Sequence, residues 1–112
     1  MTVAGIVEAL PAHVVHGESG YRDISIDRVI AGDLMSDILV SVERDTLLVT
    51  SLATEQAVRS ADIVGIPIIL LVNDKLPLPS MKDLARECGI TLLATPMPMF
   101  ESCAALGALL RA

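Results

Sequence analysis

The most informative segment of this 112-residue chain reads Ile68-Ile69-Leu70-Leu71-Val72. Every position in it is apolar, and Leu47-Leu48-Val49 repeats the pattern earlier in the chain. A strand with one face in water alternates apolar and polar residues, whereas a strand covered on both faces is apolar throughout. The two runs therefore predict central strands of a parallel sheet that helices cover on both sides.

Strands and helices alternate around these two runs. We expect strands over residues 12–16, 25–31, 46–50, 67–72 and 90–94, and helices over 3–10, 35–42, 54–61, 80–88 and 98–110. Such alternation is typical of α/β proteins. The sequence predicts an α/β fold, a three-layer α/β/α sandwich with a mostly parallel sheet of about five strands, in a single domain over residues 1–112.

Several helix ends carry their own signals. Thr2 is placed to cap the first helix, and Gly89 to end the fourth. Asp33 or Ser36 is expected to cap the second helix. At the start of the fourth, Ser80 and Asp83 approximate a capping box.

The last helix has an apolar face. Phe100, Cys103, Ala104 and Gly107 fall on one side of it at helical spacing. We therefore predict a buried stripe that includes Phe100.

Composition excludes several classes of partner. Fourteen acidic against eight basic residues give a net charge of −6 and a pI near 4.6. Nucleic acids and anionic membranes attract clustered positive charge, so we expect neither as a partner. The longest apolar run, 63–72, is too short to span a bilayer. Two cysteines without Cys-x-x-Cys spacing, and no basic residues before Val3, lead us to expect a cytoplasmic protein without a secretory signal.

No residue set in the sequence predicts catalysis. A phosphate-binding P-loop motif is absent. His13 and His16 would point to opposite faces of a strand, which disfavours a shared metal ion. Cys88 and Cys103 fall on helix faces expected to be buried, as inert thiols. We therefore expect no enzyme activity, cofactor or metal.

Polar residues gather where the predicted strands end. In an open α/β sheet, ligands bind beyond the carboxyl ends of the strands. The polar candidates at that edge are Gly32, Asp33, Thr50, Ser51, Asn73, Asp74 and Thr95. They predict a site for a small polar ligand, although turns and helix caps recruit the same residue types. Asp33 and Asp74 disfavour a strongly anionic ligand unless a cation or Lys75 compensates.

The hydrophobic content predicts self-association. Hydrophobic residues make up 53% of the chain, and mean hydropathy is +0.64. A chain this small buries only about 60–70% of its unfolded surface, so apolar surface must remain exposed. We expect a homodimer whose interface includes Met97, Met99 and Phe100. The alternatives are methionines that fill the core, and a monomer whose surplus apolar residues are alanines.

Four segments together resemble the DRTGG domain family. They are residues 29–39 with Gly32-Asp33-Leu34-Met35-Ser36, residues 46–50, residues 66–72, and Thr95 with Met99-Phe100-Glu101-Ser102. The chain is similar to the N-terminal domain of HPr kinase/phosphorylase, and we expect it to stand alone without the kinase domain. Ala53-Thr54 replaces the family's Asp-Arg, and Val72-Asn73-Asp74 replaces its Thr-Gly-Gly. No functional residue is transferred to those positions.

The resemblance implies a regulatory module without catalysis of its own. Such domains occur with CBS domains in regulated pyrophosphatases, where the combined region binds adenine nucleotides and this domain helps to form a dimer. Two hypotheses follow: a small-ligand sensor, with an adenine nucleotide as a candidate ligand, and a protein-interaction or oligomerisation module without a ligand. A small enzyme is a distant third.

Overall fold

The computed structural model describes residues 1–40 and 45–112. Within these residues the strands are β1 (His13–His16), β2 (Arg28–Ala31), β3 (Thr46–Thr50), β4 (Ile68–Leu71) and β5 (Thr91–Ala94). The helices are α1 (Val3–Ala9), α2 (Met35–Ile38), α3 (Glu55–Val64), α4 (Pro79–Cys88) and α5 (Met99–Arg111), with a short 3₁₀ helix, η1 (Tyr21–Asp23).

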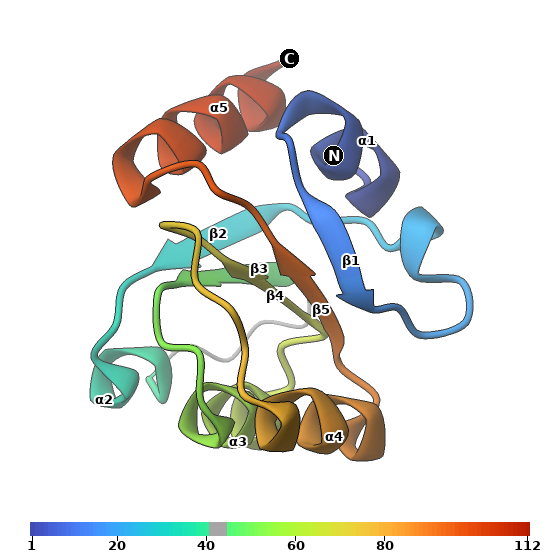
Figure 1. Cartoon of the computed structure of the whole chain (residues 1–112). Coiled ribbons are helices and arrows are strands. Elements are labelled where there is room, and N and C mark those ends of the chain that lie inside the picture. Colours follow the sequence, from blue (N-terminus) through green and yellow to red (C-terminus); the bar gives the residue numbers. More distant parts are fainter. Residues whose placement is uncertain (41–44) are drawn as a thin grey trace.

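The strands form one mostly parallel sheet in the order β1-β5-β4-β3-β2. β2, β3, β4 and β5 are parallel, and β1 pairs with β5 in the antiparallel sense. Each parallel strand lies beside its successor in the chain. The connecting helices α2, α3 and α4 therefore cross over the same face, because such crossovers keep one hand. Helices α1 and α5 cover the other face, as Figure 1 shows. The predicted α/β/α sandwich is confirmed.

Each face of the sheet has its own core. Alternate side chains of a strand point to opposite faces. Leu48, Ile69 and Leu92 therefore pack toward α3 and α4, and Leu47, Leu70 and Leu93 toward α1 and α5. β3 and β4 are buried at every position, as their continuous apolar runs predicted.

The second strand and second helix are shorter than predicted. β2 begins at Arg28 rather than at 25, and α2 covers only Met35–Ile38. Leu39 and Val40 are exposed beyond it, and position 42 lies outside the described residues. The N-cap of α2 is Leu34, so the prediction of an Asp33 or Ser36 cap was wrong. The Asp33 carboxylate bonds to the end of β3 instead.

The caps of the other helices were predicted in part. Thr2 caps α1, with its side-chain oxygen accepting from the Gly5 N–H, and Gly89 ends α4 at a positive φ of 70°. The capping box at Ser80 does not form. Leu78 is the N-cap of α4, and Pro79 follows as its first residue, where the missing N–H of proline costs nothing.

The buried face of α5 differs from the prediction. Phe100 is 79% exposed, while Leu106 is fully buried and Met99 and Cys103 pack against the core. Met99, Cys103 and Leu106 follow each other at spacings of four and three, the period of one helix face. Phe100 lies outside that stripe, so the prediction that it is buried was wrong.

Candidate binding surface at the carboxyl edge of the sheet

The parallel strands end at a common edge, here called the carboxyl edge. Thr50 of β3 pairs with Leu71 of β4, and Leu71 pairs with Ala94 of β5. Ala31 of β2 pairs with Val49. The segments that leave these strands therefore emerge side by side. All seven predicted site residues lie in or next to them.

Asp33 ties the end of β2 to the end of β3. Its Oδ1 accepts hydrogen bonds from the Thr50 hydroxyl (3.0 Å) and the Ser51 backbone N–H (2.7 Å), and its Oδ2 accepts from the Ser51 hydroxyl (2.7 Å). Partial burial raises the pKa of Asp33, but the hydrogen bonds from Ser51 and Thr50 and the nearby charge of Lys75 outweigh it. The pKa therefore lies below the ordinary value of 3.8, and Asp33 is ionised at neutral pH.

The chain reverses sharply after β4. Asn73 and Asp74 both have positive φ, 62° and 58°, and the Lys75 N–H donates to the Val72 carbonyl at 3.4 Å. Two consecutive positive φ angles closed by that bond are the pattern of a type I′ turn. Asn is well suited to such a turn, whereas Asp is strained relative to glycine.

This turn is bonded to the segment between β5 and α5. The backbone N–H groups of Asn73 and Asp74 donate to the carbonyls of Met97 and Thr95. The Asn73 side-chain oxygen accepts from the N–H of Met99, the first residue of α5, at 3.1 Å. Asn73 thus supplies the cap for α5 from another segment.

Thr95 stabilises its own loop. Its hydroxyl accepts from the Met97 N–H at 3.2 Å and donates to the Pro11 carbonyl at 3.3 Å. The Thr50 hydroxyl similarly accepts from the Leu52 N–H. The hydroxyl groups of both threonines are therefore already used in hydrogen bonds within the protein, which explains threonine at these positions without a ligand.

The structure gathers the predicted site residues into two bonded groups. Asp33, Thr50 and Ser51 form one, and Asn73, Asp74 and Thr95 form the other. A Cβ added to Gly32 would meet nothing within 4 Å, so its lack of a side chain opens free space beside the first group.

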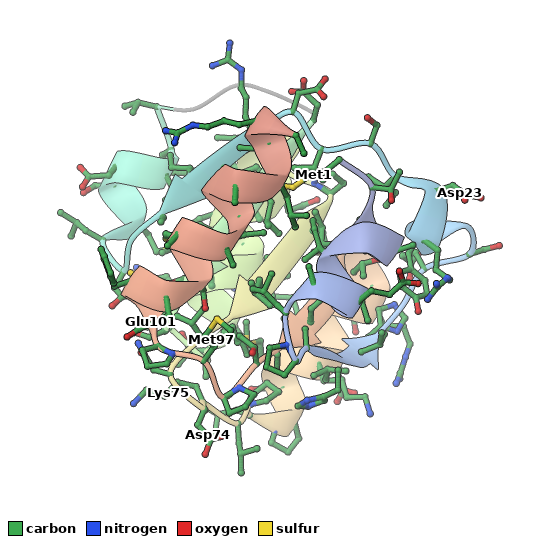
Figure 2. All side chains as sticks on the ribbon, turned by 90° about the horizontal axis from the view of Figure 1, so that it is seen from above. Met1, Asp23, Asp74, Lys75, Met97 and Glu101 are labelled. Carbon is green, nitrogen blue, oxygen red and sulfur yellow. The ribbon has the colours of Figure 1, made fainter. Side chains whose placement is uncertain are left out.

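Sequence reasoning missed several exposed residues at this edge. Leu34 follows Asp33, and Leu76 and Leu78 follow the turn after β4; all three are exposed. Apolar residues flanking Pro77 in a loop were the available signal. Glu101 is also exposed here, in the first turn of α5. Figure 2 shows Asp74, Lys75, Met97 and Glu101 close to the start of α5.

The predicted interface residues divide into two kinds. Met97 and Met99 are half-buried and pack against the core beneath α5, as the core-filler alternative described. Phe100 alone of the three projects into solvent.

The remaining chemical candidates lie elsewhere. His13 is exposed, and His16 pairs with Glu18, whose backbone N–H donates to Thr91. No group of three or more metal-ligating side chains is found among the described residues. Burial, followed by the charge of Asp62, raises the pKa of Cys88, and burial raises that of Cys103. Both thiols stay protonated at neutral pH.

Comparisons with known proteins find a similar fold, but they do not assign the chain to a family. No protein-family model matches the chain, and no curated protein matches it in sequence. Its structure is similar to the crystal structure of the CBS and DRTGG domains of the regulatory region of Clostridium perfringens pyrophosphatase, complexed with the activator diadenosine tetraphosphate. The TM-score is 0.76 at 11% identity, over 94% of this chain and 45% of that one.

That similarity establishes the fold alone. This chain spans less than half the length of the pyrophosphatase fragment. Within the described residues, no helix is long and apolar enough to cross a membrane.

Proposed function

We propose that this chain is a DRTGG-like, non-catalytic regulatory module that binds a small polar ligand at its carboxyl edge. The observation that carries the proposal is the convergence of Asp33, Ser51, Asn73 and Lys75 at the strand ends of an open sheet, where α/β proteins bind ligands. The similar pyrophosphatase region, which was crystallised with an adenine-nucleotide activator, supports this class of ligand.

The hydrogen bonds at the edge support binding rather than catalysis. The Thr50 hydroxyl donates to Asp33 and accepts from Leu52, and the Asp33 carboxylate already receives three donors. Nucleophilic catalysis needs a hydroxyl or thiol that an adjacent base activates. Asp33 is a poor base because its pKa is lowered. We expect the module to work in the cytoplasm, where its thiols stay reduced.

The groups left to contact a ligand are the Asn73 amide N–H₂, the Lys75 ammonium and the Asp74 carboxylate, all exposed. Lys75 can meet one phosphate, but Asp33 and Asp74 repel a polyphosphate. A nucleotide would therefore bind as its Mg²⁺ chelate, which carries less negative charge.

Thermal unfolding with ATP, ADP, AMP and diadenosine tetraphosphate, each with and without Mg²⁺, tests the proposal. A ligand at about 100 times its Kd stabilises the folded state by about 2.7 kcal/mol. We expect a rise in Tm with Mg²⁺ that Lys75→Ala reduces. The control Lys82→Ala, an exposed lysine on α4, should keep it. An unchanged Tm with all four nucleotides would refute adenine-nucleotide binding.

A second candidate function is oligomerisation through the start of α5. The 79% exposure of Phe100 beside half-buried Met97 and Met99 favours it, since aromatic side chains and methionine are enriched at protein interfaces. If this second candidate is right, sedimentation equilibrium at micromolar concentration gives the mass of two chains, and Phe100→Asp lowers it to that of one chain. Phe100 is the better test position, because Met99 packs on the core and its replacement would disturb folding. A single-chain mass for the wild type would refute the dimer.

A further inference from the structure

Four large exposed apolar side chains lie in the same connections as the polar residues of the carboxyl edge. They are Leu34 (62% exposed), Leu76 (80%), Leu78 (52%) and Phe100 (79%), here called the apolar rim. Each sits in a connection that leaves a strand at this edge or in the first turn of the helix that follows. Exposed apolar side chains gathered in one region mark interaction surfaces on soluble proteins.

Hydrogen bonds hold the segments that carry the apolar rim together. Asp33, next to Leu34, is bonded to Ser51. The Leu78 N–H donates to the Ala53 carbonyl, which anchors the loop after β4 to the same segment. Asn73 bonds the N–H of Met99, the neighbour of Phe100. These bonds tie the segments that carry the apolar rim to one another, so no folding step is needed to present its side chains.

The segments that carry the apolar rim contain many more acidic than basic residues. Residues 32–38, 51–55, 72–78 and 95–101 contain five acidic residues, Asp33, Asp37, Glu55, Asp74 and Glu101, and a single basic residue, Lys75. Glu55 is paired with Arg59 at 3.1 Å. The other four outnumber Lys75, so the segments that carry the apolar side chains have an excess of negative charge. Such a surface attracts positively charged partners.

We propose that the carboxyl edge docks a segment of a partner protein that carries arginine or lysine among aliphatic or aromatic side chains. The apolar side chains of the segment would cover Leu76, Leu78 and Phe100, while its cations would meet Asp74 and Glu101. A second copy of this chain fits less well, because it would bring the same acidic residues against themselves. The proposal goes beyond ligand sensing and does not require a bound nucleotide.

Fluorescence anisotropy of the full chain with a labelled amphipathic peptide of leucine and arginine tests the proposal. Two control peptides keep its pattern, one with glutamate in place of arginine and one with glycine in place of leucine. We expect the leucine–arginine peptide to bind at least roughly tenfold more tightly than either control. Leu76→Ser and Phe100→Ser should each weaken it by roughly tenfold.

Ile63→Ser provides the matched control variant. Ile63 is 73% exposed near the end of α3, away from the carboxyl edge, so its replacement should leave binding unchanged. Equal binding of the arginine and glutamate peptides, or equal loss in Ile63→Ser and Phe100→Ser, would overturn the proposal. Sedimentation equilibrium gives a further test. If the wild type has the mass of two chains and Leu76→Ser the mass of one, the apolar rim is an interface between two copies, and the proposal is overturned. Tm shifts with nucleotides, measured on the same variants, test ligand binding independently, so failure of peptide docking can be told apart from failure of the proposed function.

Discussion

The Asp33 carboxylate bonds both the backbone N–H and the hydroxyl of Ser51, each at 2.7 Å. These two residues are 18 positions apart and end neighbouring parallel strands. One side chain thus fixes the connections after β2 and β3 relative to each other. The carboxyl edge is therefore organised before any partner arrives.

Asp33→Asn should destabilise the fold by about 1 kcal/mol at neutral pH, because hydrogen bonds to a charged acceptor are stronger than those to an amide. The folded-state pKa of Asp33 is lowered, so its stabilising effect is complete above the unfolded pKa of about 3.9 and is lost as the pH falls through the folded value. Urea midpoints of the two proteins should converge as the pH falls below about 4. A difference between the two urea midpoints that stays constant across that pH range would show that the ionised carboxylate of Asp33 does not stabilise the fold.

Leu106→Ala should cost about 2–5 kcal/mol, because Leu106 is fully buried beneath α5. Leu70→Ala in the central strand β4 should cost a similar amount. Phe100→Ala should change stability by less than about 0.5 kcal/mol, since its ring is mostly in solvent. Denaturant midpoints of these variants measure the ranking. A larger loss for Phe100→Ala than for Leu106→Ala would reverse the assigned faces of α5.

Asp74→Gly should stabilise the protein by about 0.5–1 kcal/mol, because glycine adopts positive φ without strain. Asn73→Gly should not stabilise the protein, because it also removes the side-chain oxygen that accepts from the Met99 N–H. Thermal unfolding of the pair separates backbone strain from the helix cap. Equal stabilisation by both changes would mean that the Asn73 cap contributes nothing.

Alkylation by iodoacetamide should be slow at both cysteines in the folded protein at pH 7, because their raised pKa values keep them as thiols. Adding urea to unfold the chain should bring both rates up to that of a free cysteine. Fast labelling of folded Cys88 would contradict its packing against the core beneath α4.

The sequence predicted more of the fold than of the candidate site. Continuous apolar strands and helical spacing are local signals, and they located all five strands and all five α-helices of the described residues, although the predicted second helix was too long. The short 3₁₀ helix η1 was not predicted. The hydrogen-bond partners of the site residues could not be predicted. Asp33 has the local pattern of a helix cap, yet Ser51, brought beside it by strand pairing, competes for its carboxylate more effectively. Phe100 was assigned to the core on its helical spacing with Cys103, Ala104 and Gly107, but the stripe of Met99, Cys103 and Leu106 is the one that packs on the core.

Backbone amide shifts of the ¹⁵N-labelled chain, recorded during titration with Mg²⁺-ATP and separately with the leucine–arginine peptide, test most directly whether the carboxyl edge is the binding surface. We predict that the amides that shift lie in residues 32–34, 50–53, 73–78 and 95–101, with those around His16 and Ile63 unchanged. Shifts confined to β1 and η1, or none with either probe, would contradict the assignment of the carboxyl edge as the binding surface.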